Sequence, residues 1–136
     1  MKRALLVLVL LACAPPLSAQ APDEGGYLIY PEVVETQPTS MHRFLFSMMA
    51  ECLGVEDDSD AFDRIQWTVV EFILRVDDFT RMAGLWNPET RRIYLDRTKW
   101  LDPNSVSHEL IHDLTDGEIE EDDPTFARCE VKDWVP

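Results

Sequence analysis

Apolar residues recur at helical spacing in the first half of the chain. Over residues 41–53, Phe44, Met48 and Cys52 fall on one face of a helix, and Gly54 ends the pattern. This segment predicts an amphipathic helix. By contrast, the acidic residues of 56–63 lack the glycine and the terminal glutamate of a calcium loop, so they predict a solvated loop.

The rest of the pattern mixes strands with helices. β-Branched and aromatic residues are dense over 65–76, which predicts a central strand, while 27–30 predicts one short strand. The further predicted elements are a hairpin of 83–86 with 91–96, a helix over 102–114 and a last short helix over 124–129. Together they predict an α+β fold, in which the 102–114 helix packs on a small twisted antiparallel or mixed sheet of about three or four strands.

The N-terminus has the pattern of an export signal. Lys2 and Arg3 precede an unbroken apolar run, and small residues continue to Ala19, so we expect residues 1–19 to be a signal peptide. The apolar run is too short to remain in a bilayer as a spanning helix. The mature protein is therefore expected to be secreted or periplasmic. Alternatively, Cys13 is the lipidated first residue of a membrane-anchored lipoprotein.

Charge and length restrict the remaining possibilities. Prolines and glycines crowd residues 20–38, which predict an extended arm, and residues 39–136 are enough for one domain. The chain has a net charge of -14, and loss of Lys2 and Arg3 with the signal lowers it to -16. Such a surface repels nucleic acid and anionic lipid, so we expect neither as a partner. Cationic or neutral substrates are easier to accommodate, and we expect a monomer.

Two cysteines remain once the signal is set aside. In an oxidising compartment, Cys52 and Cys129 are expected to form a disulfide. The bridge would tie the 41–53 helix to the C-terminal segment.

The chemistry of the chain concentrates in the 102–114 helix. His108 and His112 are one helical turn apart, on the side opposite Leu110 and Ile111. Two imidazoles at this spacing can reach one zinc ion. Glu109 lies beside the first histidine and can act as general base on the water that zinc activates. The spacing therefore predicts a zinc site with a hydrolytic function.

A zinc hydrolase also needs a third protein ligand and an open position. The third histidine of the chain, His42, lies far upstream, whereas residues 116–123 are rich in carboxylates. Asp123, immediately before Pro124, is the first choice for the third ligand and Glu118 the second.

Several of these features resemble a known family, the small secreted zincin-like proteins of bacteria, most of which are uncharacterised. The resemblance rests on His108–His112, a following glycine turn, a residue before proline, Phe126, Cys129, Cys52, Trp67, Gly84 and residues 93–95. It implies a zincin-like domain over residues 39–136. In that family the residue before the proline is commonly a histidine that looks like the third ligand, and this chain has Asp123 there.

The resemblance also implies where a substrate would lie. In zincins an edge strand before the motif helix pairs with an extended peptide, and residues 91–96 would be that strand here. Tyr94, Arg91 and Arg92 are candidates to stabilise the oxyanion, and the spacing selects none of them.

The sequence thus predicts a zinc metallopeptidase with a peptide or protein substrate. His108, His112 and Asp123 are its expected ligands, and Glu109 is its expected base. The alternative is a non-catalytic exported module that binds a metal or docks a partner. This alternative is considered because no histidine stands at the expected position of the third ligand, and because a short chain leaves little wall for a substrate cleft.

Overall fold

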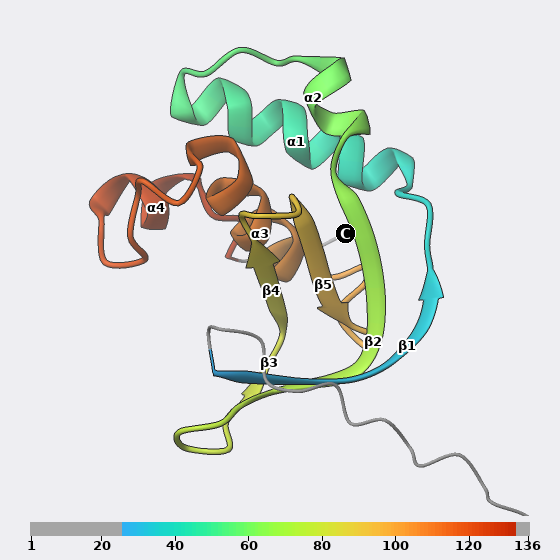
Figure 1. The fold of residues 1–136 in the computed structure, drawn as a ribbon. Helices are drawn as coiled ribbons and strands as arrows, with labels where there is room; N and C mark the ends of the chain where they lie inside the picture. Colours follow the sequence, from blue (N-terminus) through green and yellow to red (C-terminus); the bar gives the residue numbers. More distant parts are fainter. Residues whose placement is uncertain (1–25, 133–136) are drawn as a thin grey trace, which may run out of the picture.

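The sheet forms around β2, Gln66–Arg75. The structure is a computed structural model that describes residues 26–132, with the backbone alone for 31–35. The other strands are β1, Tyr27–Glu35, antiparallel to β2; β3, Arg81–Met82, paired with the end of β2; β5, Arg92–Asp96, parallel to β2; and β4, Gly84–Asn87, antiparallel to β5. Helices accompany this curled mixed sheet (Figure 1), so the predicted α+β class is confirmed.

The order of the strands places β4 at the edge of the sheet. The order is β1-β2-β5-β4, so the 83–96 hairpin inserts its second strand between β2 and β4. The prediction that residues 91–96 form the edge strand is wrong. Ile93 and Leu95 lie opposite Trp67 and Val69 of β2 and are fully buried, which holds β5 inside the sheet. The hairpin itself is confirmed.

Four helices complete the described chain. They are α1, Ser40–Leu53; α2, Ser59–Asp63; α3, Pro103–Thr115; and α4, Pro124–Cys129. The predicted helices 41–53, 102–114 and 124–129 are confirmed, whereas the predicted loop 56–63 is helical in its second half. The reason is Phe62, which is only 5% exposed and packs edge-on against Phe46 of α1.

The main core lies between the helices and β2 and β5. Apolar side chains of α1 and α3 meet there with those of the two strands, and α1 ends at Gly54, whose left-handed φ of 71° reverses the chain. The buried members are Leu45, Phe46, Met49, Phe62, Ile65, Trp67, Ile93, Leu95, Val106, Leu110, Ile111, Phe126 and Cys129. Because Leu110 and Ile111 point into this core, the neighbouring histidines of α3 face away from it.

The N-terminal strand is longer than predicted. β1 continues beyond 27–30 to Glu35 because β2 is long enough to pair with it throughout, with a register shift between Glu32 and Val34. The predicted signal, 1–19, and Cys13 lie outside the described residues. Within residues 26–132 there is no helix of the length and apolar character that crossing a membrane requires.

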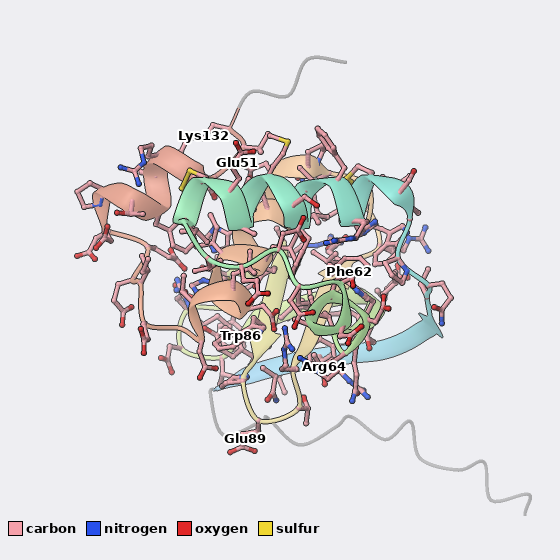
Figure 2. All side chains as sticks on the ribbon, turned by 90° about the horizontal axis from the view of Figure 1, so that it is seen from above. Glu51, Phe62, Arg64, Trp86, Glu89 and Lys132 are labelled. Carbon is pink, nitrogen blue, oxygen red and sulfur yellow. A yellow bond between two sulfur atoms is a disulfide. The ribbon has the colours of Figure 1, made fainter. Side chains whose placement is uncertain are left out.

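A disulfide joins α1 to α4. Cys52 and Cys129 are bonded, with 77 residues of sequence separation and 5.7 Å between their Cα atoms, so the predicted pair is confirmed. In Figure 2, which views the domain from above, Glu51 marks the end of α1 at which the bridge is attached. The bridge therefore attaches the C-terminal segment to the helical layer.

Replacing both cysteines by serine is expected to lower the free energy of unfolding by about 4 kcal/mol, since the unfolded chain then gains the entropy of an open loop of this length. Urea denaturation followed by circular dichroism measures the change. Glu51→Gln, on the exposed side of α1, is the control and should leave the midpoint nearly unchanged. A loss below about 1 kcal/mol in the double variant would show that the bridge contributes little.

Candidate metal centre

Both histidines of α3 point toward one carboxylate. The rings of His108 and His112 are 5.1 Å apart between centroids and meet at 74°. Their Nε2 atoms lie 3.5 Å and 4.0 Å from Oε1 of Glu121. The three side chains form a group whose ligand atoms are all within 4.8 Å of one another. The structure thus brings together two of the predicted ligands, His108 and His112. The third member of the group is Glu121, which the sequence analysis did not select.

Glu121 reaches the histidines because the chain turns back after α3. Asp116 and Gly117 have left-handed φ angles of 52° and 71°, and the Gly117 N–H donates to the carbonyl of His112 at 2.9 Å. The segment 118–122 then passes beside the histidines before α4 begins. Glu121 is exposed, with 68% of its side chain accessible, and it can therefore adjust its position.

Asp123, the predicted third ligand, lies outside this group. It is the N-cap of α4, and its Oδ1 accepts a hydrogen bond of 2.7 Å from the N–H of Thr125. Glu118, the second choice, is also outside the group. An aspartate before Pro124 has the signature of a helix cap, and this signal in the sequence favours a structural role for Asp123 over a ligand role.

The separations within this group are those of a possible metal site. Two ligands at about 2.1 Å from a tetrahedral zinc are about 3.4 Å apart, close to the separation of 3.5 Å between His108 and Glu121. Closing the remaining gap to His112 requires a small movement of Glu121. Two imidazole nitrogens and one carboxylate oxygen are also a donor set that zinc accepts in catalytic sites. The three residues could therefore hold a metal ion.

Aromatic rings hold His112 in place. Trp86 of β4 stacks on it, with 6.1 Å between ring centroids and 12° between ring planes, and Phe126 of α4 lies 5.1 Å away. Burial lowers the pKa of His112, and the neighbouring His108 adds to this effect while Glu121 opposes it. A neutral imidazole is the form that binds a metal.

Glu109 is buried between α3 and β4. It is 5% exposed, and a Cβ placed on Gly84 would lie 2.5 Å from its Oε1, so the carboxyl group fits only against a glycine. Burial raises the pKa of Glu109 to about 8, the charge of Glu121 adds to the rise, and a hydrogen bond from the backbone N–H of Trp86 opposes it.

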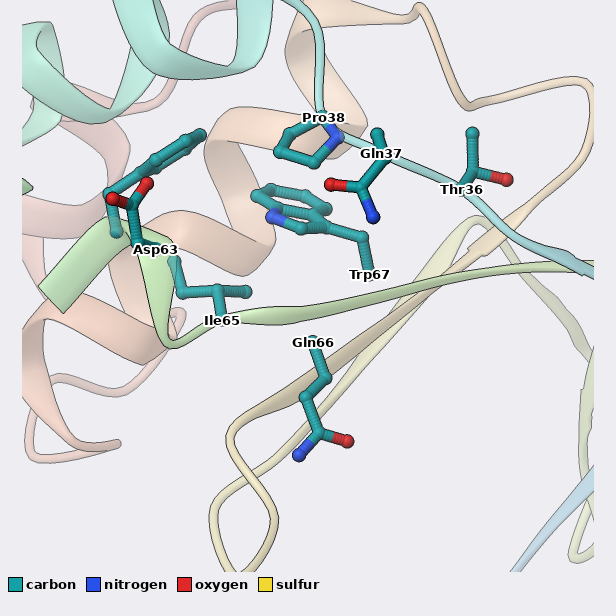
Figure 3. A pocket seen from close by; sticks show the side chains of 8 residues that line it. Thr36, Gln37, Pro38, Asp63, Ile65, Gln66 and Trp67 are labelled. Atoms are coloured by element: carbon teal, nitrogen blue, oxygen red, sulfur yellow. The ribbon is translucent and has the colours of Figure 1, made fainter. Parts of the chain in front are cut away.

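A cleft of about 270 Å³ connects these groups. It is lined by Tyr27, Met82, Gly84, Leu85, Trp86, His108, Glu109, His112 and Glu121. A larger cavity of about 640 Å³, shown in Figure 3, lies beside Trp67 and shares no lining residue with the cleft. It contains no histidine, so the chemically equipped site is the smaller one.

The predicted oxyanion stabilisers are not in this cleft. Arg91 donates two hydrogen bonds, of 2.9 Å and 2.5 Å, to the buried carboxylate of Asp113. Arg92 binds Oε1 of Gln66, and Tyr94 does not line the cleft. The buried Asp113 therefore uses Arg91 to attach α3 to the β4–β5 turn. The tyrosine that lines the cleft is Tyr27 of β1, and no local pattern in the sequence predicts that it lies there.

Comparison of the chain with models of protein families, with curated proteins and with solved structures finds no match.

Gly84→Ala is expected to lower the free energy of unfolding by about 1–3 kcal/mol, because the new methyl group overlaps the carboxyl group of Glu109. Combining it with Glu109→Ala removes the overlap. Urea denaturation of both single variants and the double variant forms a mutant cycle in which the double variant should lose less stability than the sum of the single losses. Strict additivity would mean that the two side chains do not compete for space.

Proposed function

We propose that this chain is a zinc-dependent hydrolase of peptide bonds. The observation that carries the proposal is the convergence of His108, His112 and Glu121 at one end of a cleft that also contains the buried carboxyl group of Glu109. Glu121 replaces Asp123 as the proposed third ligand, since Asp123 caps α4. Zinc at this site would polarise the scissile carbonyl and make a water molecule more acidic.

Glu109 is the proposed general base and acid. Its pKa of about 8 keeps the group protonated near neutral pH, and a cation bound beside it would favour the ionised form. This carboxylate would take a proton from the attacking water as the new C–O bond forms. It would then give this proton to the leaving nitrogen as the C–N bond breaks, so that a carboxylic acid and an amine result. The contact with Gly84 and the hydrogen bond from the Trp86 backbone fix the carboxyl group while it does so.

An extended peptide along β4 is the proposed mode of substrate binding. β4 is the edge strand, and Gly84, Leu85 and Trp86 line the cleft. Backbone pairing with a sheet edge gives affinity without demanding a particular sequence. The net charge of -14 favours peptides that are cationic or neutral.

A non-catalytic metal-binding module is the second candidate, and the volume of the cleft favours it. About 270 Å³ is at the lower limit for sites that enclose small molecules. Such a module would bind zinc with the same three residues and would show no hydrolysis that depends on Glu109.

Glu109→Gln distinguishes the two candidates. The amide cannot take up a proton, so hydrolysis of a fluorescence-quenched peptide library of mixed sequence should fall by about 100-fold or more. The zinc content, measured by elemental analysis, should stay at the wild-type value. Glu118→Gln, an exposed change in the nearby turn, is the control. Undiminished hydrolysis would remove Glu109 from the mechanism, and absence of hydrolysis in the wild type would favour the non-catalytic module.

Glu121→Ala and Asp123→Ala separate the two possible third ligands. Loss of a direct ligand should weaken zinc binding by at least about 100-fold, measured by competition with a chromophoric chelator. Asp123→Ala should leave the zinc affinity near the wild-type value while it lowers the free energy of unfolding by about 1 kcal/mol, as loss of a helix cap does. The reverse pattern of affinities would return the ligand role to Asp123.

A further inference from the structure

The ring nitrogen of His108 that faces away from Glu121 has a carboxylate partner of its own. Nδ1 lies 2.8 Å from Oε1 of Glu130, whose side chain is only 15% exposed. A carboxylate only accepts hydrogen bonds, so Nδ1 carries the proton and donates it. In the neutral imidazole the lone pair of His108 is then on Nε2, the atom that faces Glu121. Glu130 thereby selects the tautomer of His108 that can bind a metal at the proposed site.

The backbone around Glu130 is tied to α3. The N–H of Val131 donates to Oγ of Ser107 at 3.1 Å, and the carbonyl of Val131 accepts from Nδ2 of Asn104 at 2.9 Å. The N–H of Glu130 donates to the carbonyl of Phe126 at 2.9 Å, which continues the last turn of α4. These contacts lie within one turn of His108 and hold the carboxylate at a fixed place.

The disulfide adds a covalent restraint at the adjacent residue. Cys129 immediately precedes Glu130 and is bonded to Cys52 at the end of α1. Cys129 is 4% exposed, so it is also part of the core. α4 has six residues and depends on such restraints for its position. The bridge therefore restricts the range over which Glu130 can move relative to α1, which itself packs against α3.

We propose that Glu130 is a positioning residue for the metal centre, and that the Cys52–Cys129 bridge keeps it in place. This inference rests on the proposed zinc site. A carboxylate on the outer nitrogen of a ligating histidine fixes the ring orientation and makes the other nitrogen a better electron donor. His112 is oriented by different means, between the rings of Trp86 and Phe126. The two ligands therefore differ in what holds them.

Zinc affinity is the first test. Competition with a chromophoric chelator should show a loss of about 10-fold to 100-fold for Glu130→Ala. Glu130→Gln should recover part of the loss, because an amide oxygen still accepts the hydrogen bond without the negative charge. Asp122→Asn removes one charge from the exposed loop before α4 and is the matched control. Wild-type affinity in Glu130→Ala would overturn the inference.

The tautomer of His108 is a second readout, and it needs no metal. Nitrogen-15 NMR of the metal-free protein at about pH 8, where an imidazole is ordinarily neutral, distinguishes the two tautomers. His108 should carry its proton on Nδ1 in the wild type and should lose this preference in Glu130→Ala. An unchanged tautomer would contradict the role of Glu130. If the wild type binds no zinc while the tautomer depends on Glu130, the proposed function fails and the contact between the two side chains stands.

The contribution of the disulfide is tested in the Cys52→Ser, Cys129→Ser double variant under conditions where near-ultraviolet circular dichroism shows it folded. Its zinc affinity should fall toward that of Glu130→Ala, and adding Glu130→Ala should cause little further loss, because both changes act through one carboxylate. Wild-type affinity in the folded double variant would reject the role of the bridge. Fully additive losses would show that the bridge acts by another route.

Discussion

The close approach of α3 to β4 is the constraint on which the rest of the site depends. At Gly84 the strand comes so near to the helix that the carboxyl group of Glu109 occupies the space of a side chain. Further along β4, the indole N–H of Trp86 donates a hydrogen bond of 3.3 Å to the carboxylate of Asp113 on α3. Arg91 donates to the same carboxylate. These contacts fix the rotation of α3 about its axis, so His108 and His112 face the cleft while Leu110 and Ile111 face the core.

The C-terminal segment completes the site from the other side. The turn after α3 brings Glu121 to the two imidazoles, and α4 then places Phe126 against both rings, with centroid distances of 4.9 Å and 5.1 Å. The disulfide at Cys129 attaches this whole segment to α1. The site is therefore built between two supports, an edge strand and a bridged C-terminal segment. Neither support would position all the groups alone.

Local patterns predicted those features that depend on local physics. The spacing of apolar residues identified α1 and α3, the density of β-branched residues identified β2, and the cysteine count identified the bridge. The helix and strand signals depend on residues that are close in the sequence. The disulfide could be predicted because only two cysteines remain outside the predicted signal peptide. The predicted position of the histidines on one helical face has the same origin.

Features that depend on tertiary contacts could not be predicted in this way. The choice among the acids of 116–123 depends on how the chain leaves Gly117, and the sequence alone does not specify that path. Likewise, the sequence offered Arg91 as a candidate to stabilise the oxyanion, and only the structure shows that Arg91 instead donates to Asp113. The edge position of β4 follows from the insertion of β5 beside β2, which is a question of topology. Phe62 is the one large apolar residue of 56–63, and a single such residue has no helical periodicity from which α2 could be predicted.

The charge of Glu121 makes the potential beside Glu109 and His112 negative, which favours a positive charge at this place. Glu121 lies 3.5 Å and 4.0 Å from the Nε2 atoms of His108 and His112, and its negative charge opposes ionisation of the buried Glu109. Groups of like polarity that converge without a proton or a cation between them raise the free energy of the folded state. Burial strengthens this repulsion at Glu109, since little water is present to screen it. A divalent cation bound by His108, His112 and Glu121 would offset the negative potential that Glu121 imposes on Glu109, and this is the physical basis on which the proposed zinc site rests.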